Sequence, residues 1–108
     1  MALTYKNARQ AVGTSYTTVY TCPAATQAVV VAVQVANLTA LSANVSLQWL
    51  DSSASNAATR LINALPIPGS TAVSLLAGPL VLEPGDVLQA LASATSSFEL
   101  SVSITEIT

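Results

Sequence analysis

The sequence has 108 residues, enough for one domain with a single hydrophobic core and too few for two cores of ordinary size. Only 7% of the residues are charged and the formal net charge is -2, whereas a typical soluble protein has about 25% charged residues. Three basic residues are too few to neutralise a nucleic-acid backbone, and the longest apolar stretch falls short of the roughly 20 residues of a membrane-spanning helix, so we expect neither nucleic-acid binding nor membrane insertion.

The chain begins with a segment that differs from the rest, MALTYKNARQAVGTS. It holds two of the three basic residues, Lys6 and Arg9, and shows no steady alternation of polar and apolar side chains. We expect residues 1–15 to form an N-terminal arm that docks on a neighbouring copy through Tyr5, Lys6 and Arg9. A frayed end and one more strand of the chain's own sandwich are the alternatives. No apolar segment follows the basic residues as it would in a secretory signal, so we expect synthesis in the cytoplasm.

From residue 16 onward, apolar and polar side chains alternate with a period of two, which is typical of β-strands. In the first such segment, Tyr16 and Tyr20 lie on the same face. The next segment is QAVVVAVQVA, in which we expect one face to be made of Val29, Val31, Val33 and Val35. The opposite face carries smaller side chains, which let another layer come close.

Two later segments alternate most clearly. The inward side chains of ANVSLQWLD are predicted to be Val45, Leu47 and Trp49, and those of FELSVSITEI to be Phe98, Leu100, Val102 and Ile104. Between turns we expect about eight strands, at residues 15–22, 27–37, 43–51, 58–65, 71–77, 79–83, 86–93 and 97–107. The predicted fold is therefore all-β, a single antiparallel β-sandwich of jelly-roll-like form over residues 16–108.

The segment Glu83-Pro84-Gly85-Asp86 separates two of these strands. Pro84 suits the first central position of a type II turn, and Gly85 supplies the positive φ that the second position needs. Glu83 and Asp86 flank the turn and are expected to keep its tip in water. A cation site is the alternative, but two carboxylates are too few for a hard cation that takes six or more oxygens, so we predict no metal.

The residues that most enzymes use are missing. The chain has no histidine, which removes serine and cysteine nucleophiles activated by histidine as well as histidine metal sites. Cys22 is the one cysteine and has no charged neighbour in sequence that would lower its pKa, so we interpret it as a buried strand residue. No glycine-rich phosphate-binding spacing occurs. We predict no catalytic residues, no cofactor and no enzymatic activity.

The scarcity of charge needs an explanation of its own. Lysine and glutamate are depleted where surface becomes the centre of an interface, so we favour a surface that meets other protein. A surface rich in serine and threonine that stays soluble through its hydroxyls is the alternative. Carbohydrate binding is a third hypothesis, favoured if Tyr16, Tyr20 or Trp49 is exposed in a shallow groove, whereas burial of all three favours assembly.

Five segments follow one another in the order TVYTCPAATQAVVVAVQVANL, VSLQWLDSS, LPIPGSTAVSL, LVLEPGDVLQALASA and LSVSITEI. In this order the chain resembles a group of small β-sandwich virion proteins of tailed bacteriophages, over about residues 16–108. The resemblance implies a structural role in a virion, on the head or on the tail, and carries no catalytic residues.

We therefore predict a bacteriophage virion structural protein, foremost a capsid decoration or cement protein that stabilises the head through protein–protein contacts. Its predicted partners are the major capsid protein or other virion proteins and further copies of itself, in a homo-oligomer such as a trimer. A component of the tail, neck or fibre is one alternative, and a carbohydrate-binding module for host attachment is another. The candidate partner-binding residues are Tyr5, Lys6, Arg9, Tyr16 and Tyr20.

Overall fold

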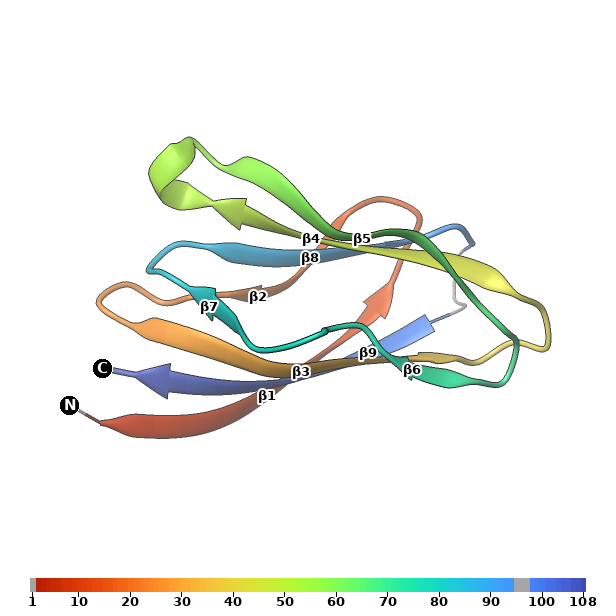
Figure 1. Ribbon diagram of the computed structural model, residues 1–108, viewed down its shortest axis with the longest axis horizontal. Coiled ribbons are helices and arrows are strands. Elements are labelled where there is room, and N and C mark those ends of the chain that lie inside the picture. The colour runs from red at the N-terminus through yellow and green to blue at the C-terminus, as the bar shows by residue number, and fades with distance from the viewer. Residues whose placement is uncertain (1, 95–97) are drawn as a thin grey trace.

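A computed structural model describes residues 2–94 and 98–108. Within these residues the chain forms nine strands and one short 3-10 helix, η1 (Ser52–Ala54), arranged as two antiparallel sheets packed face to face (Figure 1). The strands are β1 (Leu3–Val12), β2 (Thr17–Thr21), β3 (Gln27–Asn37), β4 (Ala43–Asp51), β5 (Ala57–Ile67), β6 (Ala72–Ser74), β7 (Leu80–Leu82), β8 (Val87–Ala92) and β9 (Phe98–Ile107). The predicted all-β sandwich is confirmed. None of the described segments is a helix that could span a membrane.

The strand order is that of a jelly roll. One sheet runs β1-β9-β3-β6, with β7 also on β3, and the other runs β2-β8-β4-β5. Strands β6 and β7 pair with different halves of β3, so they act as two pieces of one interrupted edge strand. Counted that way, the eight strands cross between the two sheets as in a double Greek key.

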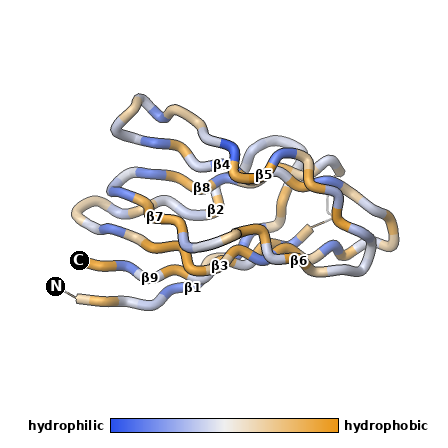
Figure 2. Tube along the Cα trace, in the orientation of Figure 1, coloured by the Kyte–Doolittle hydropathy of each residue, from blue (hydrophilic) through white to orange (hydrophobic). Residues whose placement is uncertain are grey.

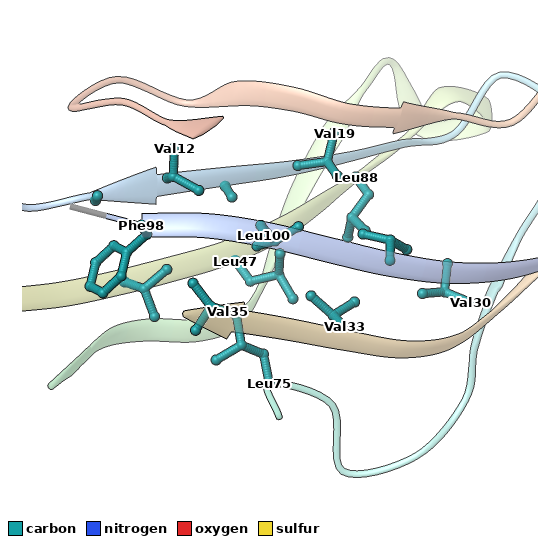
Figure 3. Packing of buried hydrophobic residues seen from close by; sticks show 14 of the residues in the cluster. Val12, Val19, Val30, Val33, Val35, Leu47, Leu75, Leu88, Phe98 and Leu100 are labelled. Atoms are coloured by element: carbon teal, nitrogen blue, oxygen red, sulfur yellow. The ribbon is translucent and has the colours of Figure 1, made fainter. Parts of the chain in front are cut away.

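The core lies between the two sheets. Its largest fully buried side chains include Phe98, Leu47, Ile67, Leu82, Leu88 and Leu100. Figure 3 shows Phe98, Leu47, Leu88 and Leu100 among the packed side chains. The predicted inward faces of β4 and β9 are confirmed for every residue but Trp49, which is half-buried and packs against the edge of the core. Figure 2 shows apolar and pale segments following one another along the strands, with few strongly hydrophilic stretches.

Strand β3 corrects one prediction. Its pairing with β9 shifts register between Val30 and Ala32, which marks a β-bulge at Val31. A bulge adds one residue to one strand and so reverses the phase of the alternation beyond it. The four odd-numbered valines therefore do not share one face: Val33 and Val35 are buried, but before the bulge the buried residues are Ala28 and Val30, and Val31 is 53% exposed.

Strand β1 corrects a second prediction, that of a separate N-terminal arm. We expected residues 1–15 to be an arm outside the sandwich, but Leu3 to Val12 pair along their whole length with β9, and Ala2 and Thr108 exchange backbone hydrogen bonds at the termini. The alternation is hidden because β1 is an edge strand whose first half is exposed on both faces, and only Val12 at its end enters the core. The domain boundary expected at residue 15 is therefore absent from the fold.

Candidate functional site

The outer face of the four-stranded sheet is covered by the chain's own side chains. Gln48 donates a hydrogen bond to Gln89 on the neighbouring strand (Nε2 to Oε1, 2.8 Å) and is only 7% exposed. The guanidinium carbon of Arg60 lies 5.5 Å from the centre of the Tyr16 ring, within the range of a cation–π contact. Tyr16 is thus engaged within the chain, on a face that long polar side chains already occupy.

The outer face of the five-stranded sheet is different, and we call it the bare face. It consists of the outward side chains of β1, β9, β3 and β7, and four of the large exposed apolar residues of the molecule lie on it: Leu3 (54%), Tyr5 (79%), Val31 (53%) and Val81 (62%). Between them are mainly short side chains such as Ser101 and Ser103 of β9 and Ala32 and Ala36 of β3. The side chains of this face are therefore mostly short and weakly polar.

Two shallow hollows lie on the bare face. Tyr5, Asn7 and Val31 line one of them, near the N-terminal end of β1. The other lies near the opposite end of the strands and is lined by Arg9 and Glu99 together with Gln10, Ala11, Gln34, Ala36, Leu100 and Ser101. Large side chains at the margins and small ones in the middle explain both depressions.

Arg9 and Glu99 are the charged strand residues of the bare face. Both are exposed, and they lie on neighbouring strands, since Arg9 is opposite Ser101 and Glu99 is opposite Ala11 in the β1–β9 ladder. Among the described residues, the ion pair of the protein is formed elsewhere, by Lys6 and Glu106. The bare face therefore presents one positive and one negative charge that form no ion pair with any residue that the structure describes.

The inward side of the same sheet carries a polar group of three residues. Glu106 of β9 is 5% exposed and accepts a hydrogen bond from the Tyr20 hydroxyl of the opposite sheet, while the Lys6 ammonium lies 3.1 Å from its other carboxylate oxygen. The hydrogen bond from Tyr20 holds the pKa of Glu106 below its usual range despite burial, and Lys6 adds to the effect. Burial, followed by the hydrogen bond to Glu106, raises the pKa of Tyr20.

These contacts bear on the predicted partner-binding residues. Lys6 and Tyr20 have a role inside the chain, so their predicted contacts with a partner stay predictions, as does that of Tyr16. Tyr5 and Arg9 are the two that project freely from the bare face. Glu106 was missed by the sequence analysis, although it continues the even-numbered inward phase of β9 and so signalled a buried carboxylate in need of partners.

The turn at Pro84 and Gly85 forms as predicted. Gly85 has φ of 87° and the backbone nitrogen of Asp86 donates to the Glu83 carbonyl at 3.0 Å. The expectation that Asp86 faces water is wrong, because its side chain is 1% exposed. Its carboxylate accepts hydrogen bonds from the Ser52 nitrogen (2.9 Å), the Ser52 hydroxyl (3.0 Å) and the Glu83 nitrogen (2.9 Å), so it ties the turn to η1.

A third carboxylate, Asp51, joins this region. One oxygen from each of Asp51, Glu83 and Asp86 lies within 4.8 Å of the others, a grouping that the sequence could not show. Asp51 also accepts hydrogen bonds from the nitrogen and the hydroxyl of Ser53, at 3.1 and 2.7 Å. Because the chain's own donors occupy both oxygens of Asp86 and one oxygen of Asp51, the cluster is best explained as a structural device that holds η1 against the turn.

Cys22 lies just after β2 and is buried. Its Sγ donates to the Thr26 carbonyl at 3.2 Å. Burial, and then the nearby negative charges of Asp86 and Glu106, raise the pKa of the thiol. A protonated, enclosed thiol is a poor nucleophile, in keeping with the structural role predicted for Cys22.

Comparison with known proteins gives one informative result. No family model matches the chain, and no curated protein matches its sequence. Among solved structures, the fold is similar to that of a protein of Bacillus endospore appendages, which form a family of disulfide-linked pili. The TM-score is 0.60, with 9% identity over 99% of this chain and 87% of the other. At that identity the similarity shows a shared fold, and the resemblance to phage virion proteins stays a prediction.

Proposed function

We propose that the protein is a structural, non-catalytic subunit of an assembly that contains many copies. The observation that carries the proposal is the bare face, where Leu3, Tyr5, Val31 and Val81 project from one sheet while the opposite sheet covers its own outer face. Exposed apolar side chains gathered on one face are typical of protein contact surfaces. A chain with 7% charged residues has little electrostatic repulsion between copies, which also favours association.

Within this class we propose a virion location, as a decoration or cement protein that binds the major capsid protein on the outside of a phage head. The resemblance of five sequence segments, in their order along the chain, to phage virion proteins supports this proposal, and the jelly-roll fold is compatible with it. A tail, neck or fibre component would use the same fold and the same kind of surface. The structural similarity to a pilus protein supports self-assembly in general and does not favour one of these two locations over the other.

The first experiment measures association directly. Analytical ultracentrifugation of the purified chain should show a self-associating species, and cosedimentation should show binding to phage heads that lack the protein. We expect a buried interface of about 1,000 Å² or more, above most crystal-packing contacts. A chain that stays monomeric at high concentration and also fails to bind phage heads would contradict the proposal.

The carbohydrate-binding alternative depended on an exposed Tyr16, Tyr20 or Trp49. All three are partly buried, neither exposed nor fully buried, and each contacts its own chain: Tyr16 lies beside Arg60, Tyr20 donates to Glu106 and Trp49 packs against the core. Tyr5 is exposed beside a hollow, but it has no second aromatic ring among the residues that line that hollow. A glycan array on the purified chain separates the two functions, since assembly predicts no glycan bound.

A further inference from the structure

The bare face combines three properties that bear on what covers it. Its apolar side chains gather toward one end of the strands, and its middle carries short side chains. Its two charges are opposite in sign and form no ion pair within the part of the chain that the structure describes. A partner with a strong charge of one sign would satisfy only one of the two. A second copy of the same face carries one charge of each sign and is therefore electrically complementary to it.

The register of the β1–β9 ladder shows how two such faces would meet. Arg9 lies opposite Ser101 and Glu99 opposite Ala11, so the two charged residues are on adjacent strands and two residues apart along them. We consider a second copy related to the first by a two-fold axis. The axis is parallel to the strands and lies just outside the bare face, above the line between β1 and β9. This rotation sets β1 of each copy over β9 of the other and keeps every residue at its own height along the strands.

In this arrangement Arg9 of one copy lies two residues, roughly 7 Å along the strand, from Glu99 of the other, and the two facing sheets are about 10 Å apart, so the pair forms when both side chains extend toward each other. The two-fold axis forms this contact twice. Leu3 is set over Ile107 of the other copy, and Tyr5 over Thr105, because these residues are paired in the ladder. Charged residues therefore meet opposite charges, and the apolar end of one face meets the apolar end of the other.

We propose that two copies of this chain associate through their bare faces about such an axis, with Arg9 of each copy paired to Glu99 of the other. The inference rests on the proposed function, which is self-association, and specifies the surface and the contacts. Isologous contacts of this kind are the most common way in which homo-oligomers form. In a larger assembly the dimer would be one of its repeating contacts.

The size of the face sets the conditions of the test. With the axis over the line between β1 and β9, only these two strands of each copy lie over each other, and two strands about 4.8 Å apart and ten residues long make about 300 Å² per copy. This is below the usual size of stable interfaces, so we expect a weak dimer, with Val31 of β3 and Val81 of β7 outside its contact. The concentration series therefore runs from micromolar to millimolar.

The experiment uses sedimentation equilibrium on the full chain and on charge-reversal variants. R9E places two glutamates at each contact and E99R places two arginines there, so each variant should raise the dimer dissociation constant at least tenfold. The double variant R9E/E99R exchanges the charges and should restore the constant to within about threefold of the unsubstituted chain. Circular dichroism melting curves confirm that each variant is folded, as expected for exposed positions.

A second pair of variants tests the apolar end. Leu3→Ser removes an exposed leucine from the bare face and should weaken association, whereas Leu41→Ser removes a more exposed leucine that lies in the loop between β3 and β4 and should not. The pair matches in chemistry and differs in location. An equal effect of both substitutions would contradict the proposed surface.

The remaining outcomes separate this inference from the proposed function. Association that is unaffected by R9E, E99R and Leu3→Ser would overturn the inference and leave self-association standing, through another surface such as the free edge of β1. Failure of the double variant to restore association would overturn the Arg9–Glu99 pairing. If the chain is monomeric but binds phage heads, and the bare-face variants abolish that binding, the face meets the capsid and the choice of a second copy is wrong.

Discussion

Glu106 is the residue at which polar contacts join the two sheets. Its carboxylate faces the interior beside a strand edge, where Lys6 of the same sheet and Tyr20 of the other reach it. A buried carboxylate without partners would be costly. Two donors therefore make Glu106 a stabilising contact in its ionised form, and its lowered pKa reflects that preference.

This preference predicts a dependence of stability on pH. Because the folded-state pKa of Glu106 lies below its unfolded value, its contribution is complete above about pH 4.3 and is lost as pH falls through the folded value. The melting temperature of Glu106→Gln should therefore be lower than that of the unsubstituted chain at pH 7, and the difference should shrink toward pH 3. Glu99→Gln makes the same chemical change on the exposed face of the same strand and should show little difference at either pH. A difference in melting temperature between Glu106→Gln and the unsubstituted chain that is the same at pH 7 and pH 3 would contradict the stabilising role of the ionised Glu106.

Gly85 is the residue on which the turn depends. An added Cβ would sit at positive φ and would also meet the Ser52 Oγ at 3.0 Å and Cβ at 3.2 Å. We expect Gly85→Ala to lower the free energy of unfolding by about 1–2 kcal/mol in urea denaturation. Gly78→Ala is the control, because a Cβ there has no neighbour within 4 Å. Equal effects at both glycines would show that the turn geometry is not what matters.

Calcium tests the carboxylates beside this turn. The hydrogen bonds that already occupy Asp51 and Asp86 leave few oxygens for a hard cation. Millimolar calcium should therefore leave the melting temperature unchanged. A rise of many degrees would show that the three carboxylates form a cation site after all.

Strand β1 shows how an element can belong to a fold without a sequence pattern of its own. It is held by a full ladder with β9 and by Val12 in the core, while most of its other side chains are exposed. Its side chains point alternately to the two faces like those of any strand, but in its first half both faces are exposed, so the inward positions need not be apolar. The lack of alternation in β1 therefore reflects its place at the edge rather than a separate arm.

Truncation tests whether β1 belongs to the sandwich. Deleting residues 1–12 should lower the melting temperature by many degrees or prevent folding, because β9 loses its ladder partner, the core loses Val12 and Glu106 loses Lys6. Deleting only residues 1–4 removes the exposed side chains of Ala2, Leu3 and Thr4 and should have a much smaller effect. Thermal unfolding followed by circular dichroism measures both. An unchanged melting temperature for the longer deletion would restore the view of a dispensable arm.

At the scale of the whole molecule, the two sheets differ in what they leave outside. Their inner faces form one apolar core, whereas one outer face is closed by glutamines, Arg60 and Tyr16 and the other is left bare. The low overall charge of the chain is therefore most evident on one side. That asymmetry is what a subunit needs in order to associate through a particular surface.

The extent of the core predicts how substitutions in it rank. Leu47→Ala creates a cavity at a fully buried position and should cost about 2–5 kcal/mol of unfolding free energy. Trp49→Ala should cost less than the about 3–5 kcal/mol typical of a fully buried tryptophan, because Trp49 is half-buried. We therefore expect Leu47→Ala to lower the free energy of unfolding more than Trp49→Ala, and urea denaturation of the two variants measures both losses. A larger loss for Trp49→Ala would place the centre of the core nearer to the end of β4.

The local sequence was sufficient for the strands after β1, for most of the inward faces of β4 and β9 and for one turn. A period of two places the side chains of β4 and β9 on opposite sides whatever the neighbouring strands are, and a proline followed by a glycine restricts the backbone by itself. The strand boundaries and the buried positions at Leu47, Phe98 and Leu100 follow from these local rules.

The tertiary structure alone decided the rest, because each remaining feature depends on what pairs with what. The bulge at Val31 arises from the register with β9, and the place of β1 arises from a partner nearly a full chain length away. Glu106 gains its donors, and Asp51 joins Asp86, only when distant strands come together. Which outer face is bare depends on where Tyr16 and Arg60 lie after folding, and no alternation along a single strand contains that information.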